Sequence, residues 1–156
     1  MAQLHEEFIH FATCMQRLNS AWVTLNAVKA ASDSPLAGPA FRFALVEYAT
    51  PYNRSDGPSK QRYKLTESYI PSEFLALHQR ILTGRNTVHA HADLTVMEAK
   101  LYVAETRGTP SVTISSNYIN GLEEMKNIDQ IIGLIEGTLL NMYADQDTHL
   151  HALQQP

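Results

Sequence analysis

The chain of 156 residues contains only one cysteine and one tryptophan, and only 18% of its residues are charged. A single cysteine, Cys14, excludes an internal disulfide and a cysteine-based zinc site and is typical of a reducing compartment. No apolar run approaches the roughly 18 residues that a membrane-spanning helix needs, and the start, MAQLHEEFIH, is acidic where a secretion signal is basic. We therefore expect a cytoplasmic protein.

The sequence also lacks an excess of basic residues. Its 12 Lys and Arg against 16 Asp and Glu give a formal net charge of −4. The surface as a whole does not attract nucleic acid, so any such contact needs a local basic patch. The apolar fraction of 44% is that of a compact protein. At this length we expect one domain, 1–156, with a flexible polar tail over 144–156.

Apolar spacing predicts a mainly α, up-down helical bundle of about four main helices. In the first thirty residues apolar side chains recur at steps of three and four, which predicts a long amphipathic helix. These are Leu4, Phe8, Phe11, Met15, Leu18, Trp22, Leu25 and Val28. After Gly38-Pro39, the segment AFRFALVEYA predicts a shorter second helix.

The third and fourth helices are expected in the second half of the chain, with a small β-hairpin between them. The third begins at Pro71 and runs on to about residue 93, and the fourth has Asn120 as its N-cap and an apolar stripe from Leu122 to Met142. The segments KLYVAET and SVTISS, joined by the turn RGTP, predict the hairpin.

Two glycines of the last helix, Gly133 and Gly137, lie one turn apart. Each costs about 1 kcal/mol relative to alanine in a helix interior. Close approach of another helix would explain them, and simple tolerance would do so as well. The histidines of the tail, His149 and His151, are assigned no function.

Residues 51–68 have no lasting period and predict an exposed loop. Four basic residues in this stretch are candidate RNA-binding residues: Arg54, Lys60, Arg62 and Lys64. Tyr52 and Tyr63 are interleaved with them, and tyrosines can stack on bases while cations bind the phosphates. A solvated loop without function is the competing interpretation.

The stretch RNTVHAHAD, residues 85–93, concentrates the residue types that carry chemistry. His89, His91 and Asp93 would point the same way on a strand and could then bind a metal. On a helix, positions 89 and 91 lie about 200° apart and the metal site fails. Because the apolar stripe before the stretch is helical, we favour the helix. We expect no metal and no cofactor.

The pattern Arg85-Asn86-x-x-x-Ala90-His91-x-Asp93 resembles the R-x(4–6)-H motif of HEPN proteins, and the predicted order of helices is similar to theirs. The resemblance implies a dimeric, metal-independent endoribonuclease of a bacterial toxin–antitoxin or phage-defence system, or a non-catalytic relative. It also implies an antitoxin or a nucleotidyltransferase-type partner. A homodimer is expected because family sites are assembled from two chains.

The chemistry assigns a role to each residue of the motif. His91 is the expected general base or acid and Arg85 the clamp for the charge that grows on the phosphate. Asn86 is an orienting donor, and His89 is the second-ranked histidine. The product would be a 2′,3′-cyclic phosphate. Structural use of Arg85, for instance in an ion pair with Asp93, and a non-catalytic dimeric helical-bundle interaction module remain the alternatives.

Overall fold

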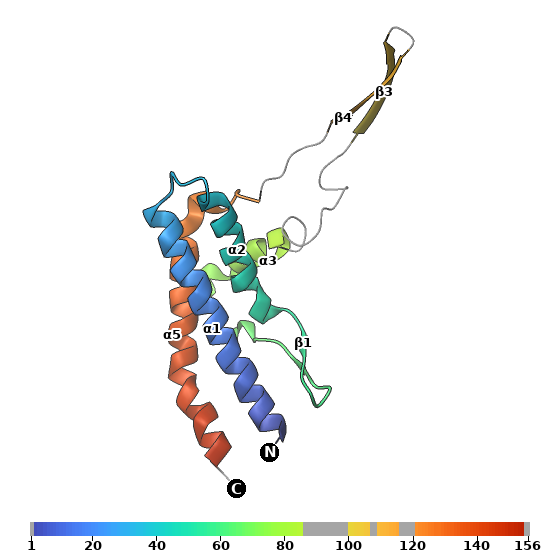
Figure 1. Ribbon diagram of the computed structural model, residues 1–156. Helices are drawn as coiled ribbons and strands as arrows, with labels where there is room; N and C mark the ends of the chain where they lie inside the picture. The colour runs from blue at the N-terminus through green and yellow to red at the C-terminus, as the bar shows by residue number, and fades with distance from the viewer. Residues whose placement is uncertain (1, 86–99, 107–108, 116–120, 155–156) are drawn as a thin grey trace.

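The computed structural model describes residues 2–85, 100–106, 109–115 and 121–154 (Figure 1). They form the α-helices α1 (Ala2–Ala30), α2 (Ala37–Ala49), α3 (Leu75–Gly84) and α5 (Ile128–Gln154). Strands β1 (Ser55–Asp56) and β2 (Arg62–Tyr63) pair antiparallel, as do β3 (Lys100–Thr106) and β4 (Thr109–Ser115). The predicted mainly α fold, with a β-hairpin between the third and fourth main helices, is confirmed.

Helices α1 and α5 are the long, antiparallel axis of the bundle, and both termini lie at the same end (Figure 1). Three polar contacts fix their register. Asn19 donates to the Tyr143 hydroxyl (2.9 Å), Trp22 Nε1 donates to Glu136 (2.8 Å), and Lys29 pairs with Asp129 (2.6 Å). The residue numbers of the α5 partners decrease as those of the α1 residues increase, as expected for two antiparallel helices.

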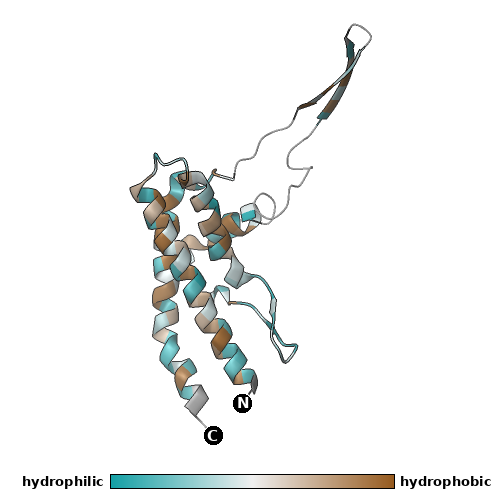
Figure 2. Ribbon diagram, in the orientation of Figure 1, coloured by the Kyte–Doolittle hydropathy of each residue, from teal (hydrophilic) through white to brown (hydrophobic). Residues whose placement is uncertain are grey.

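The core lies where α1, α2 and α5 meet, and Figure 2 shows their apolar turns facing one another. Leu18, Leu25, Phe41, Ile131 and Ile135 are buried at 3% exposure or less, as the 3.6-residue period of each helix predicts. Complete burial of one such side chain stabilises the fold by about 1.5–3 kcal/mol. The bundle is therefore held mainly by these three helices.

Residues 51–68 are more ordered than the predicted exposed loop, so that prediction is wrong in part. The 3₁₀ turn η1 (Thr50–Tyr52) directly continues α2, and its Pro51 and Tyr52 are buried. Leu65 is buried as well, and its N–H donates to the Pro51 carbonyl (2.9 Å). Two apolar anchors thus hold the ends of the segment while the β1–β2 hairpin projects between them.

The last helix begins later and ends later than the sequence predicts. The 3₁₀ turn η5 (Met125–Asn127) precedes α5, so the helix starts at Ile128, and the predicted N-cap Asn120 lies outside the described residues. Instead of fraying from Ala144, α5 continues to Gln154. The turns after Tyr143 include several hydrophilic residues (Figure 2), and they make contacts with α1 and with Tyr69.

The third helix is preceded by the 3₁₀ turns η2 (Glu67–Tyr69) and η3 (Ser72–Phe74), and α3 begins at Leu75 rather than at Pro71. Its predicted course beyond 85 lies outside the described residues. The glycines of α5 are covered by Pro71 and by the 3₁₀ turn η3 before α3, and not by another α-helix. A Cβ at Gly137 would stand 2.6 Å from the Pro71 ring, and one at Gly133 would stand 3.4 Å from Phe74.

Candidate functional site

Arg85, one of the predicted catalytic residues, lies at the C-terminal end of α3. It is the C-cap residue, with helical backbone angles (φ −60°, ψ −46°) and a half-buried side chain. It follows the buried Ile81 by four residues, so it continues the face of α3 that packs on the bundle. Asn86, His89 and His91 lie outside the described residues, so their convergence with Arg85 stays a prediction.

The alternative metal site predicted from the sequence consists of His89, His91 and Asp93, and all three lie outside the described residues. Within the part that is described, no group of three or more His, Cys, Asp or Glu residues could hold a metal ion.

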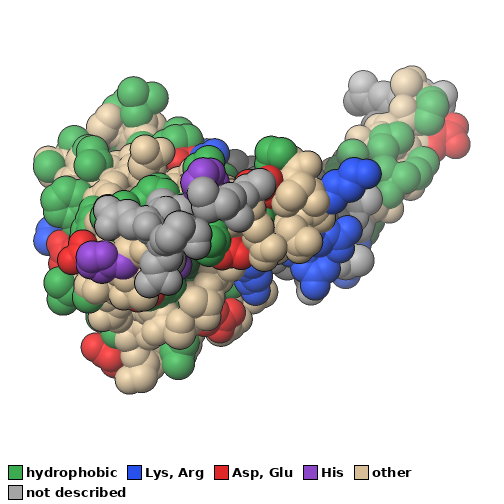
Figure 3. Space-filling model, turned by 90° about the horizontal axis from the view of Figure 1, so that it is seen from below, with side chains coloured by type: hydrophobic (Ala, Val, Ile, Leu, Met, Phe, Trp, Pro, Cys, Tyr) green, Lys and Arg blue, Asp and Glu red, His purple; other side chains and the backbone are tan. Residues whose placement is uncertain are grey.

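The four predicted RNA-binding residues are all exposed, and the structure divides them into two pairs. Arg62 and Lys64 line a pocket on the flank of the bundle, whereas Arg54 and Lys60 do not. Arg62 belongs to β2, where its Nε lies 3.4 Å from the Asp56 carboxylate of β1. Figure 3 shows several Lys and Arg side chains close together on one side of the molecule in that view.

Glu6 of α1 fastens the β1–β2 hairpin beside this pocket. Its carboxylate accepts hydrogen bonds from the Ser59 N–H (3.0 Å), the Ser59 hydroxyl (2.6 Å) and the Tyr63 hydroxyl (2.9 Å). The hydrogen bond from the Ser59 side chain is the main reason that the pKa of Glu6 is lowered. The carboxylate is thus held ionised, and the hairpin keeps a fixed position on α1.

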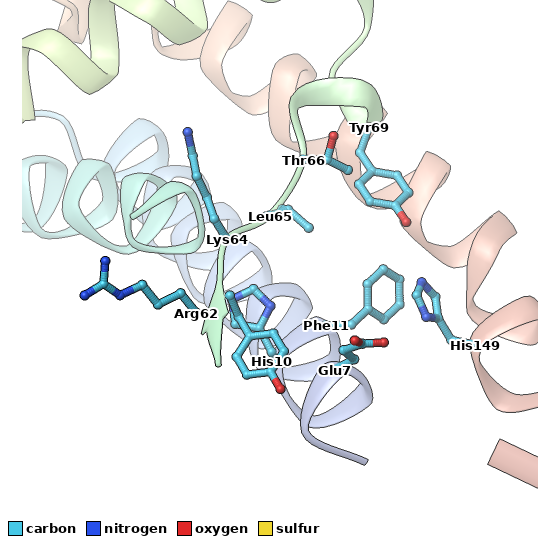
Figure 4. A pocket seen from close by; sticks show the side chains of 10 residues that line it. Glu7, His10, Phe11, Arg62, Lys64, Leu65, Thr66, Tyr69 and His149 are labelled. Carbon is cyan, nitrogen blue, oxygen red and sulfur yellow. The ribbon is translucent and has the colours of Figure 1, made fainter. Parts of the chain in front are cut away.

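The pocket is a hollow of about 260 Å³ between α1, the segment from β2 to η2, and α5 (Figure 4). Helix α1 supplies Glu7, His10 and Phe11, and α5 supplies His149. The remaining lining residues follow one another along the chain from the hairpin: Arg62, Tyr63, Lys64, Leu65, Thr66 and Tyr69. Aromatic rings, two cations and one carboxylate therefore surround the same space.

One wall is a stacked pair of rings from α1 and β2. The centroids of His10 and Tyr63 are 5.6 Å apart with an interplanar angle of 29°. Burial lowers the pKa of His10, which keeps its imidazole neutral at pH 7. The Cys14 sulfur lies 3.6 Å from His10 Nε2 behind this wall. A neutral ring stacked on a tyrosine is a flat, uncharged surface.

The opposite wall is built by α1 and the last turns of α5. Phe11 packs on His149 with ring centroids 4.2 Å apart. Tyr69 donates to Asp145 Oδ2 at 2.6 Å, and His149 Nε2 lies 3.5 Å from the same oxygen. Burial, followed by the hydrogen bond to Asp145, raises the pKa of Tyr69 to about 12. The same hydrogen bond lowers the pKa of Asp145, so the carboxylate holds both rings in place.

A second group of polar residues lies in the core. The ring of His78 on α3 is fully buried, and its Nδ1 lies 2.7 Å from the Tyr48 hydroxyl. Burial lowers the pKa of His78 and raises that of Tyr48, so a neutral imidazole and a protonated hydroxyl share this hydrogen bond. The other ring nitrogen, Nε2, lies 3.7 Å from the Glu67 carboxylate. No pocket residue belongs to this group, and we assign it a structural role.

The sequence alone identifies three of the ten lining residues, Arg62, Tyr63 and Lys64. It does not identify the other seven, which are Glu7, His10, Phe11, Leu65, Thr66, Tyr69 and His149. The spacing of Phe11 predicts a position in the core, and the polar composition around His149 predicts a flexible tail. His10 and Tyr69 carried no signal, because facing positions on α1 and η2 are set by tertiary contacts. The i, i+4 pair of Asp145 and His149 was the one available hint that the tail is helical.

Comparison of this chain with models of protein families, with curated proteins and with solved structures finds no match. Among the described helices, none combines the length and the apolarity that crossing a bilayer requires.

Proposed function

We propose that this protein binds RNA, and that the pocket between α1, β2 and α5 receives an unstacked nucleotide. One observation carries the proposal. Arg62 and Lys64, which the sequence singles out as phosphate ligands, line the same hollow as the stacked His10–Tyr63 pair. Proteins bind single-stranded nucleic acid by combining Lys and Arg side chains, which contact the phosphates, with aromatic rings on which the bases stack.

The lining residues divide the recognition among them. Arg62 and Lys64 are exposed at the rim and can bind consecutive phosphates, which offsets the repulsion from the acidic remainder of the surface. The rings supply an uncharged face for a base. Glu7 can accept a hydrogen bond from a ribose 2′-hydroxyl and Thr66 can exchange one with it. Those two contacts favour RNA over DNA.

Fluorescence anisotropy with a labelled single-stranded RNA of mixed sequence tests the binding. We expect the double variant Arg62→Ala, Lys64→Ala to weaken binding at least tenfold at low salt. The variant Arg54→Ala, Lys60→Ala removes the same charge from the same segment outside the pocket, and it should change affinity much less. If the two variants lose the same amount of RNA affinity, binding depends on the overall charge of the segment, and the proposal that the pocket binds RNA is wrong.

Cleavage of the bound RNA is the finer part of the proposal. Arg85 is half-buried on the bundle-facing side of α3, which favours a role other than ordinary helix surface. In the proposed reaction His91 takes the proton of the 2′-hydroxyl, and the oxygen attacks the adjacent phosphorus. The 5′-oxygen leaves and takes a proton from water, and the product is a 2′,3′-cyclic phosphate. Arg85 stabilises the charge on the phosphate, and Asn86 orients it.

Incubation with RNA in excess chelator, followed by analysis of the termini, tests the cleavage. Arg85→Ala and His91→Ala should abolish the cyclic-phosphate ends, with smaller losses for Asn86→Ala and His89→Ala. The matched control is Arg80→Ala, because Arg80 lies on the same helix but pairs with Glu124 at 2.7 Å. If RNA binds but the wild type leaves it intact, the protein is a non-catalytic RNA-binding module. A cytoplasmic location and an antitoxin or nucleotidyltransferase-type partner complete the proposal.

A further inference from the structure

The β3–β4 hairpin has one apolar and one polar face. Its register pairs Leu101 with Ile114 and Val103 with Val112. Because strand side chains alternate, these four lie on one face, whereas Tyr102 and serine and threonine residues occupy the other. The four apolar side chains are 61–70% exposed. The one charged residue described on this face, Glu105, lies at its loop end.

Nothing among the described residues covers that face. Each strand packs extensively only against the other, and Figure 1 shows the hairpin standing apart from the helices. A two-stranded hairpin is marginally stable by itself in water and needs a hydrophobic surface to pack on. The exposed face is therefore incomplete as it stands.

The bundle carries an apolar groove of matching character. It is a hollow of about 160 Å³ at the seam of α1 and α2, lined by small or apolar residues and by no charged one. Its lining includes Thr24, Ala27, Ala31, Leu36, Ala37 and Ala40. Leu36 is 70% exposed at its rim, and Phe43, which follows Ala40 by three residues on α2, is 53% exposed.

We propose that the hairpin of one chain seats its apolar face on the α1–α2 groove of a second copy of the chain, which returns the same contact. This inference is independent of RNA binding and goes beyond it. Both surfaces belong to the same chain and both lack charge at their centre. In a dimer with two-fold symmetry, each hairpin therefore packs on the groove of the other chain, and both apolar faces and both grooves are buried.

The size of the surfaces favours this exchange over other arrangements. Seven residue pairs give a hairpin face about 24 Å long and about 10 Å wide. One hairpin packed on another, or on one groove, buries roughly 500 Å² in total, which is the size of a casual contact. A reciprocal exchange buries roughly 1,000 Å², which reaches the range of specific interfaces.

Cross-linking of mixed chains tests the arrangement, because Cys14 is 3% exposed and leaves a silent background. One chain carries Leu36→Cys at the groove, the other carries Val112→Cys on the apolar face, and a short bis-maleimide is added. We expect a dimer that contains one chain of each kind. Thr113→Cys, the neighbouring position on the polar face, is the matched control and should yield at least tenfold less product.

Each other outcome overturns the proposal. A product from Val112→Cys chains alone would mean that hairpins pack on hairpins. A monomeric internal cross-link in the double variant Leu36→Cys, Val112→Cys would place the hairpin on its own bundle.

Light scattering in solution is a second test, and it should give twice the 17.5 kDa of the chain. Val103→Ser should raise the dimer dissociation constant at least tenfold, and Thr113→Ser should leave it unchanged. A wild type that stays monomeric at high concentration would end the proposal.

Discussion

At the scale of single residues, the most consequential side chain in the core is one that can take up a proton. The side chain of His78 is fully buried, and its Nδ1 shares a 2.7 Å hydrogen bond with the Tyr48 hydroxyl. Desolvation dominates its environment and lowers its pKa, although Glu67 acts in the opposite direction. The histidine is therefore a point at which acid weakens the fold.

This predicts that stability is lost on acidification. The folded pKa of His78 lies below the 6.5 of an unfolded histidine. The unfolded state therefore binds more protons once the pH falls through 6.5, and the contribution is fully present above it. Urea unfolding at pH 8 and pH 5 should show a larger loss for the wild type than for His78→Gln. His5→Gln, at an exposed histidine, should keep the wild-type loss. A His78→Gln protein with the same pH dependence as the wild type would contradict the assignment.

At the scale of elements, the sequence predicted the helices better than their limits. The apolar stripes of α1 and α5 and the alternation in β3 and β4 are local signals, and each identified its element. The bounds at Ile128 and Gln154 are set by contacts that lie far away in the sequence, such as the Tyr69–Asp145 hydrogen bond. Composition alone classed the same residues as a polar tail.

The packing of η3 on α5 gives a test at this scale. A Cβ at Gly137 would overlap the Pro71 ring at 2.6 Å, and a proline ring cannot turn away as a flexible side chain can. Gly137→Ala should therefore destabilise the fold by about 1–3 kcal/mol, and lower the melting temperature by roughly 3–10 °C. Gly84→Ala on α3 is the control. It meets nothing within 4 Å and should stabilise by about 0.5–1 kcal/mol. Equal melting temperatures in the two variants would contradict the close contact.

At the scale of the whole molecule, the candidate site is assembled from the beginning, the middle and the end of the chain. Arg62 and Lys64 could be predicted because charge is visible in a sequence. Their partners His10 and His149 could not, because helical periodicity shows which residues share a face but not which faces meet. The predicted Arg85–His91 pair depends in the same way on tertiary contacts, and its histidine lies outside the described residues.

The charge of the molecule predicts how RNA binding responds to salt. With a net charge of −4, only the two pocket cations contribute favourably at the site. Two phosphate contacts on a single strand give a slope of about −1.4 in a plot of log affinity against log salt. Arg62→Ala should reduce that slope by about 0.7, whereas Lys60→Ala should leave it in place. A slope near zero in the wild type would mean that RNA is not held by its phosphates.

The apolar part of α5 contributes to the core, whereas its hydrophilic part contributes to the pocket, so stability and the shape of the pocket depend on different turns of one helix. Among the α5 residues up to His151, Met142 is the last fully buried side chain, whereas Asp145 and His149 belong to the wall of the pocket. A chain shortened after Tyr143 would thus keep the fully buried side chains of α5 and lose His149, which packs on Phe11 in one wall of the pocket. Under the proposed function, changes in the turns of α5 after Tyr143 act on RNA recognition more than on the folding of the bundle.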